Sequence, residues 1–255
     1  MTSKNKIIKI CGVKSVQDCA TAISLNANNI GIICVPNKKR TCDPLTAKEI
    51  SNLVHQSKDV ELVGVFQKQG IEEILDISKD YGLDIIQIHD DNPQWIELVI
   101  NNIKYGNVTT DDDDDTRKKY KFYKRMCFPR DCDEIIRLTE YFNTTTNNKV
   151  FENLLILFDG EQGGTGEQLN WPGIQAFLKK YYDNTNFPEN KKFNFILAGG
   201  LTPDNVSQAI KTIPLITGVD VSGGVEKSNQ VIGSNNTKDL IKLQNFIKNS
   251  QQAFF

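Results

Sequence analysis

Short apolar segments of β-type residues alternate with stretches of helical periodicity along the whole 255-residue chain. Eight of these segments are predicted to be strands. They are Ile7–Cys11, Asn29–Val35, Val60–Phe66, Asp84–Ile88, Phe122–Phe128, Leu154–Asp159, Phe193–Ala198 and Gly218–Val221. Strands that alternate with helices pair in parallel through right-handed crossovers, and eight of them close naturally into a barrel. The sequence therefore predicts an α/β fold, a single (β/α)8 barrel; the alternatives are an open doubly wound sheet or two small domains.

Helices are expected between these strands. Apolar residues recur at positions i, i+3, i+4 and i+7 in stretches that begin at Val16, Ile71 and Ile174, and each pattern gives one apolar stripe to lay on a sheet. Three dipeptides place a capping side chain before a proline suited to the first helical position. They are Asp43-Pro44, Asn92-Pro93 and Thr202-Pro203. Ser15 with Asp18 forms a capping-box pattern. The last helix is expected over Thr237–Lys248, with Gln251–Phe255 frayed.

An acidic segment interrupts the alternation. Asp111–Asp115 is followed directly by basic residues, and a block of like charge cannot pack into a core. We therefore predict a solvated, disordered insertion around residues 107–119 of the single barrel domain. A metal site on these aspartates is the alternative, and it is disfavoured because carboxylates on a disordered loop lack preorganisation. Asn143–Asn148 is interpreted as a second loop of this kind.

Composition excludes several classes of function. The formal net charge is −2 and the pI about 5.8, so the chain lacks the basic footprint of a protein that binds nucleic acid or an anionic membrane. Its apolar runs have the length of strands, and its first residues lack the apolar core of a signal peptide. We expect a cytoplasmic protein, a monomer or homodimer, with no nucleic-acid or membrane partner.

The cysteines and histidines give no sign of a metal site. The chain has six cysteines, an even number that is compatible with disulfides, but a reducing cytoplasm favours free thiols. No CxxC pair is present, and the two histidines, His55 and His89, are far apart in the sequence. A zinc site is therefore not expected.

Polar residues and glycines collect at the carboxyl ends of the predicted strands, where parallel barrels carry their active sites. They are Cys11-Gly12, Arg40, His89, Asp159, Gly163–Gly166, Gly199-Gly200 and Ser222-Gly223-Gly224. The glycines after the last two strands let backbone N–H groups approach an anion closely, and barrels often bind phosphate there. The alternative is that these glycines only form tight turns. Gly163–Gly166 is interpreted as a lid or as a second wall of the phosphate site.

Three side chains at this end are candidates for chemistry. Cys11 taken alone is more typical of a small buried hydrophobic residue. Asp159 ends an apolar strand and must face the pocket, because a buried carboxylate is costly. Arg40 could bind a carboxylate through two hydrogen bonds or lie on the surface. Lys9, two residues before Cys11, is expected to point away from the interior, and no role is assigned to it.

Taken together and in order, these motifs resemble those of the phosphoribosylanthranilate isomerase family of tryptophan biosynthesis. The resemblance spans nearly the whole chain. Its motifs are Lys9–Gly12, Gly31–Pro36 with Lys39–Thr41, Leu62–Phe66, Asp84–His89, Phe158–Asp159, Gly163–Gly166 with Trp171, Leu197–Val206 and Gly218–Glu226.

The resemblance implies an Amadori rearrangement of N-(5-phosphoribosyl)anthranilate to 1-(2-carboxyphenylamino)-1-deoxyribulose 5-phosphate, with no cofactor. It implies that Cys11 is the general base, that Asp159 is the general acid and that Arg40 holds the anthranilate carboxylate. The other implied substrate-binding residues are His89, Gly164, Gly199, Gly200, Asp220, Ser222, Gly223 and Gly224. Such a base must be a thiolate in electropositive surroundings, and such an acid needs a pKa raised by desolvation.

The sequence departs from the family pattern at two places. Asp90-Asp91 follows His89 where glycine and an acid are usual, and Gly160 stands where a hydroxyl residue often follows the acid. Two other functions are the alternatives. A ribose-phosphate isomerase of histidine biosynthesis would need aspartates on strands one and five, and Phe122–Phe128 has no acid. A phosphate-binding barrel without enzyme activity would be expected to lack Cys11 or Asp159.

Overall fold

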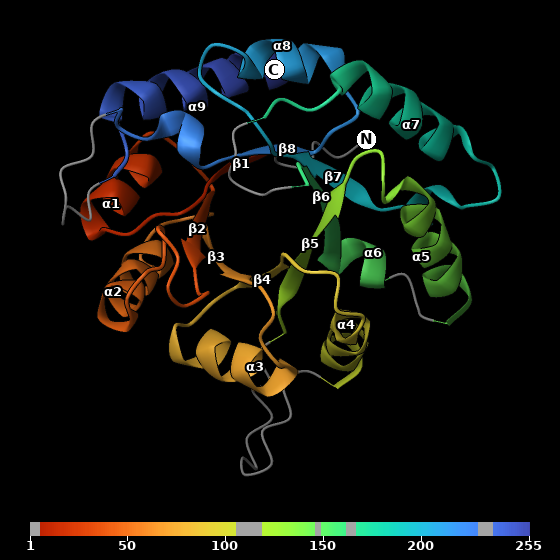
Figure 1. Ribbon diagram of the computed structural model, residues 1–255, viewed down its shortest axis with the longest axis horizontal. Helices are drawn as coiled ribbons and strands as arrows, with labels where there is room; N and C mark the ends of the chain where they lie inside the picture. The colour runs from red at the N-terminus through yellow and green to blue at the C-terminus, as the bar shows by residue number, and fades with distance from the viewer. Residues whose placement is uncertain (1–5, 106–118, 146–148, 162–166, 229–236) are drawn as a thin grey trace.

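Eight parallel strands close into a barrel in the computed structural model, which describes residues 6–105, 119–145, 149–161, 167–228 and 237–255. Each strand pairs with its neighbours in the sequence, and β1 pairs with β8 to complete the ring. Helices surround the strands (Figure 1). The predicted (β/α)8 barrel is thus confirmed, and the open sheet is excluded.

The elements alternate in the predicted order, with three short additions, one α-helix and two 3₁₀ turns. The strands are β1 (Ile7–Ile10), β2 (Asn29–Ile33), β3 (Glu61–Phe66), β4 (Ile85–Ile88), β5 (Lys121–Cys127), β6 (Leu154–Asp159), β7 (Asn194–Leu197) and β8 (Gly218–Val221). The α-helices are α1 (Val16–Ser24), α2 (Pro44–His55), α3 (Ile71–Asp80), α4 (Gln94–Tyr105), α5 (Cys132–Thr145), α6 (Lys149–Asn153), α7 (Trp171–Asp183), α8 (Val206–Thr212) and α9 (Leu240–Phe254). Two 3₁₀ turns, η1 (Glu189–Lys191) and η2 (Gly223–Val225), precede β7 and follow β8.

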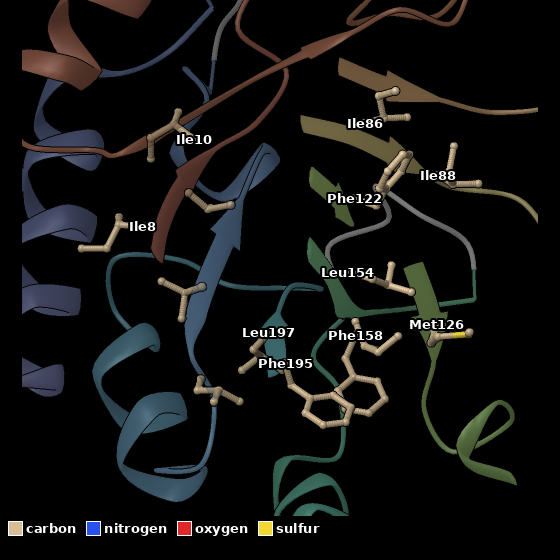
Figure 2. Packing of buried hydrophobic residues seen from close by; sticks show 14 of the residues in the cluster. Ile8, Ile10, Ile86, Ile88, Phe122, Met126, Leu154, Phe158, Phe195 and Leu197 are labelled. Carbon is tan, nitrogen blue, oxygen red and sulfur yellow. The ribbon is translucent and has the colours of Figure 1, made fainter. Parts of the chain in front are cut away.

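Each strand contributes to two apolar layers, because successive side chains point to opposite faces. The outward side chains form the large core between strands and helices, part of which is shown in Figure 2. There the rings of Phe158 on β6 and Phe195 on β7 stack with their centroids 5.3 Å apart. The inward side chains, such as Leu157 and Ile196, fill the barrel interior. A side chain's position along its strand therefore decides whether it stabilises the core or reaches the pocket.

Helix starts follow the predicted capping chemistry at two places. The Ser15 hydroxyl accepts a hydrogen bond from the Asp18 amide at 3.1 Å at the start of α1. The Asp43 carboxylate accepts one from the Thr46 amide at 3.0 Å, and Pro44 is the first residue of α2. Both interactions satisfy amides that have no partner within the helix.

Several predicted boundaries were wrong: α9 begins at Leu240 and not at Thr237, and α4 begins at Gln94, one residue after Pro93. Thr202-Pro203 does not start a helix, because the Asn205 and Val206 amides donate to the Thr202 carbonyl oxygen and form a turn first, so α8 begins at Val206. Gln251–Phe255 is not frayed, since α9 continues to Phe254 over the buried Ser250. Residues 143–145 of the expected loop Asn143–Asn148 belong to α5.

The acidic insertion remains a prediction, because Asp111–Asp115 and residues 146–148 lie outside the described residues. Helix α6 was not expected, and it buries Val150 and Phe151 immediately before β6. None of the helices in the described ranges combines the length and the apolar character needed to cross a membrane.

Candidate active site

A polar cavity of about 400 Å³ opens at the carboxyl ends of β6, β7 and β8. Its lining includes Arg40, Asp159, Gly199, Gly200, Asp220, Ser222, Gly223, Gly224 and Glu226. Eight of the predicted site residues are among these. A second cavity, of about 420 Å³, lies at the amino ends of the strands and contains the ion-paired Glu61 and Lys121. Since parallel barrels place their chemistry at the carboxyl ends, the first cavity is the candidate active site.

Asp159 ends β6 at the cavity, with 13% of its side chain exposed. Burial raises its pKa, while the Gly160 amide, which donates to Oδ1 at 2.8 Å, partly opposes that rise by stabilising the charge. The nearby Asp220 carboxylate raises the pKa further. The group is therefore biased toward the protonated form that a general acid needs.

His89 follows β4 and faces Asp159, with Nε2 and Oδ2 3.9 Å apart. Burial lowers its pKa to about 3, and the positive charges of Arg125, Lys9 and Lys124 contribute to the lowering. The imidazole is therefore neutral near pH 7. It can offer a hydrogen bond to a ligand, but it does not form a charged pair with Asp159.

Cys11 follows β1 and is buried, with 6% of the residue exposed. Its thiol forms a hydrogen bond with the Lys9 side chain, and the Lys9 ammonium donates to Asp220 Oδ1 at 3.0 Å. The expectation that Lys9 points away from the interior was wrong. Residues i and i+2 of a strand share a face, so Lys9 and Cys11 point to the same side of β1. Lys9 pairs in register with Asp220 across the β1–β8 seam and is fully buried.

Arg40 lies in the loop after β2 and is held by the carboxylate of Glu226, which follows η2. Its Nε donates to Glu226 Oε1 at 2.5 Å, and its Nη2 donates to Oε2 at 3.2 Å. This pairing raises the pKa of Arg40. Burial alone would raise the pKa of Glu226, but Arg40, Lys238 and Lys39 together lower it. One edge of the guanidinium is occupied by Glu226, and Nη1 lies on the opposite edge.

The glycines after β7 and β8 occupy positions that other residues could not. Gly199 and Gly200 have φ angles of +72° and +65°, and a Cβ on Gly200 would lie 2.6 Å from the Glu167 carbonyl oxygen. A Cβ on Gly224 would lie 2.0 Å from the Leu201 carbonyl oxygen. The two loops therefore pack backbone against backbone beside the cavity, which leaves N–H groups available at short range.

The Ser222 hydroxyl adds a polar atom to this wall. Its Oγ is buried, and within the described residues it has no hydrogen-bond partner. A buried hydroxyl without a partner is costly, and a bound anion would satisfy it. Of the predicted substrate-binding residues, Gly164 lies outside the described residues.

Three side chains of the site were missed from the sequence. The fully buried Lys238 ammonium donates to the carbonyl oxygens of Cys11 at 2.7 Å and Ser222 at 3.1 Å, and burial lowers its pKa to about 8. Arg125 on β5 donates to the Glu161 carbonyl oxygen at 2.7 Å, and Glu226 orients Arg40. Strand alternation could have placed Arg125 inside the barrel, because Tyr123 two residues earlier is interior. The position of Lys238, before the last helix, carried no such signal.

Both departures from the family pattern have a structural account. Asp90 forms its turn with side-chain oxygens, which accept from the amides of Lys68 at 2.6 Å and Asn92 at 3.0 Å. At Gly160 an added Cβ would meet nothing within 4 Å, so the position has room for a hydroxyl residue. The glycine amide itself supplies the hydrogen bond to Asp159.

Within the described ranges, no group of three or more histidine, cysteine, aspartate or glutamate side chains is arranged to hold a metal ion. The arrangement that the structure does show consists of a buried thiol beside an ammonium, a carboxyl group with a raised pKa and a glycine-lined wall. A (β/α)8 barrel with this set of groups belongs to the class that can perform acid–base chemistry on an anionic substrate.

Comparison with known proteins identifies the family within this class. The chain matches the family model described as "N-(5'phosphoribosyl)anthranilate (PRA) isomerase" over residues 8–127 and 109–249. It is 38% identical to the N-(5'-phosphoribosyl)anthranilate isomerase of Saccharomyces kudriavzevii and 36% identical to that of Saccharomyces cerevisiae, and each alignment covers 98% of this chain and 96% of the relative. The solved structure of phosphoribosyl anthranilate isomerase from Thermotoga maritima is similar with a TM-score of 0.70 and 25% identity, over 97% of this chain and 99% of that one. The chain belongs to the N-(5'-phosphoribosyl)anthranilate isomerase family.

Proposed function

We propose that the protein isomerises N-(5-phosphoribosyl)anthranilate to 1-(2-carboxyphenylamino)-1-deoxyribulose 5-phosphate in tryptophan biosynthesis, in the cytoplasm and as a monomer or homodimer. The observation that carries the proposal is the position of Asp159. A carboxyl group whose pKa is raised by burial shares one cavity with a glycine-lined wall and an oriented arginine. Membership of the family supplies the substrate.

The substrate has two anionic ends, and the cavity has a complementary group for each. We assign the phosphate to the loops after β7 and β8, where Ser222 offers an unpartnered hydroxyl and the glycines offer amides. The anthranilate carboxylate is assigned to Arg40, through the guanidinium edge that Glu226 leaves free. The ribose then lies between these two anchors, close to Asp159 and Asp220. His89 is neutral and completes the wall beside Asp159.

The reaction needs one acid and one base. Asp159 gives its proton to the furanose ring oxygen, and the ring opens to a protonated Schiff base. The Cys11 thiolate then removes the C2′ proton, and the electron pair of that C–H bond neutralises the iminium to give an enolamine. The enolamine tautomerises to the ketone when C1′ gains a proton and the C2′ hydroxyl loses one. The iminium nitrogen accepts the electrons, so the residues need no cofactor for this step.

A fluorescence assay that follows consumption of phosphoribosylanthranilate tests the function directly. Purified protein is expected to turn the substrate over, and Cys11→Ala and Asp159→Asn are each expected to reduce kcat by at least about 100-fold. Binding of the product should remain, because the anchoring groups of both anions stay in place.

Two matched variants serve as controls for these changes. Cys132→Ala and Asp183→Asn alter the same residue types on α5 and α7, at positions that do not line the cavity, and they should keep the wild-type kcat. Wild-type protein without isomerase activity would contradict the function. Full turnover by Cys11→Ala or Asp159→Asn would contradict the assigned roles alone.

A further inference from the structure

Lys9 is a buried ammonium placed between the thiol of Cys11 and the carboxylate of Asp220. It hydrogen-bonds to both side chains, and the bond to Asp220 Oδ1 measures 3.0 Å. No part of Lys9 is exposed. A lysine is almost never buried in this way unless its charge is compensated, so the interior of the barrel is built to keep this ammonium.

The packing of β2 brings Lys9 close to the sulfur. Gly31 lies opposite both side chains, and a Cβ at this position would be 3.0 Å from Cys11 Sγ and 3.1 Å from Lys9 Cε. Any residue larger than glycine would therefore push the sulfur and the lysine stem out of their places. The close approach of the ammonium to the thiol thus depends on the shape of the barrel interior as well as on charge.

The electrostatic surroundings of Cys11 combine opposing effects. The charged or titratable groups that act on it are Lys9 of β1, Cys34 after β2, Arg40 in the loop after β2, Asp220 of β8 and Lys238 before α9. Burial has the largest effect and, with Asp220, raises the pKa of the thiol above its usual value; Lys9 and Lys238 oppose that rise without cancelling it. Lys9 exerts the largest lowering effect. Asp220 and Cys11 in turn keep the pKa of Lys9 raised despite its burial, so the ammonium remains charged.

We propose that Lys9 is a positioning residue that stabilises the Cys11 sulfur as the thiolate, with Asp220 holding the ammonium in place. The inference rests on the proposed function, since it explains how a buried thiol can act as the base in the isomerisation. When the thiol ionises, its proton leaves to solvent and the negative charge on sulfur is shared with the Lys9 ammonium. Abstraction of the C2′ proton then returns the sulfur to the thiol, and Lys9 keeps its charge throughout.

Alkylation of Cys11 by iodoacetamide, followed against pH and read by mass spectrometry of the Cys11 peptide, tests the proposal without substrate. The thiolate is the reactive form, so the pH midpoint of alkylation reports the pKa of the thiol. Lys9→Met should move this midpoint upward by at least about one pH unit, which is about tenfold slower alkylation below the midpoint. Lys9→Arg keeps a cation and should move it less.

Two further variants make the outcome independent of a general loss of structure. Lys124→Met removes another buried lysine, which bonds to the carbonyl oxygens of Asp90 and Arg125, and should leave the Cys11 midpoint unchanged. Gly31→Ala keeps every charge but places a Cβ 3.0 Å from Cys11 Sγ and 3.1 Å from Lys9 Cε, so it should separate the two groups and move the midpoint upward. This variant tests the proposal even if Lys9→Met does not fold.

Failure of the inference is distinct from failure of the proposed function. Folded Lys9→Met or folded Gly31→Ala with the wild-type midpoint would overturn the role of Lys9. If the variants showed the expected shifts in the alkylation midpoint but the wild-type protein did not consume phosphoribosylanthranilate, the proposed function would fail. The coupling of Lys9 to Cys11 would stand.

Discussion

Cys11 differs from other buried cysteines of the chain in the charges that surround it. Burial, together with the adjacent carboxylates of Asp18 and Asp43, raises the pKa of Cys19 and of Cys42 to about 12. Cys11 is buried as well, but it faces two ammonium groups, those of Lys9 and Lys238. At the scale of the residue, the charges packed around a cysteine decide whether it behaves as a core residue or as a base.

Glu226 allows a prediction about substrate affinity. Glu226→Gln removes the negative charge that fixes the Arg40 guanidinium, so Arg40 would be free to turn away from the substrate carboxylate. We expect KM to rise by about tenfold, or ~1.4 kcal/mol, with a smaller change in kcat, as steady-state kinetics would measure.

Lys39→Met is the matched control for this change. The Lys39 ammonium is 3.6 Å from Glu226 but 66% exposed, and such exposed pairs contribute little. It should leave KM within about twofold of the wild type. An unchanged KM in Glu226→Gln would show that Arg40 does not depend on this carboxylate.

The residues of the site were predictable to different degrees. Asp159 stood out because a carboxylate ends an apolar strand, whereas the base role of Cys11 came from family resemblance. Lys9 was misplaced although strand alternation puts it on the same face as Cys11. Lys238 could not have been found, because its contacts join the two ends of the barrel across more than 200 positions of sequence.

At the scale of the element, the loops after β7 and β8 act as one unit. The backbone of Gly224 packs against that of Leu201, and Asn205 Nδ2 ties the first loop together by donating to the Gly200 carbonyl oxygen at 2.9 Å. A change in either loop therefore alters the wall that both form. This coupling makes the glycines, more than any charged side chain, the determinants of the proposed phosphate site.

Gly200→Ala is expected to weaken phosphate binding. Its φ of +65° is strained for alanine, and the new Cβ would collide with the Glu167 backbone. Inhibition of the isomerase by inorganic phosphate measures the effect, and the inhibition constant should rise by at least about tenfold, or ~1.4 kcal/mol.

Gly70→Ala provides the comparison for that experiment. Gly70 precedes α3 with an ordinary φ of −72°, and a Cβ there meets nothing within 4 Å. Phosphate inhibition of this variant should match that of the wild type. Equal inhibition of Gly200→Ala would remove the loop after β7 from the phosphate site.

The hydrophobic periodicity of the sequence predicted which strands and helices form. It predicted the residues at which they begin and end less accurately. All eight strands were located, because their apolar runs are short and bounded by polar residues. The start of α8 was missed because residues 202–205 form a turn first, in which the amides of Asn205 and Val206 both donate to the Thr202 carbonyl oxygen. The end of α9 was missed because burial of Ser250 against the barrel is a tertiary effect that a local pattern does not contain.

At the scale of the whole molecule, the stability core and the site share the same strands. Phe158 is fully buried and packs its ring against Phe128, Phe177 and Phe195, while the next residue of the strand is Asp159. Packing of the outward-facing Phe158 in the core thus fixes the position of the inward-facing Asp159. The barrel was predictable from the eightfold alternation, whereas the positions of its buried charges were not.

Phe158→Ala is expected to destabilise the protein by about 3–5 kcal/mol, the usual cost of removing a fully buried ring. Urea denaturation would measure the free energy of unfolding. Phe255→Ala is the control, because Phe255 is 86% exposed, and its change should stay within about 0.5 kcal/mol. A loss below 1 kcal/mol in Phe158→Ala would show that the core around β6 can collapse around the missing ring.

The seam between β1 and β8 has a consequence for the newly made chain. Cys11 and Lys9 are synthesised more than 200 positions before Asp220 and Lys238, their partners across the seam. A nascent chain that has not reached β8 carries the thiol without the carboxylate and the second ammonium that surround it in the closed barrel. The surroundings of the sulfur are therefore completed only when β1 and β8 pair, so closure of the barrel and assembly of the site are the same event.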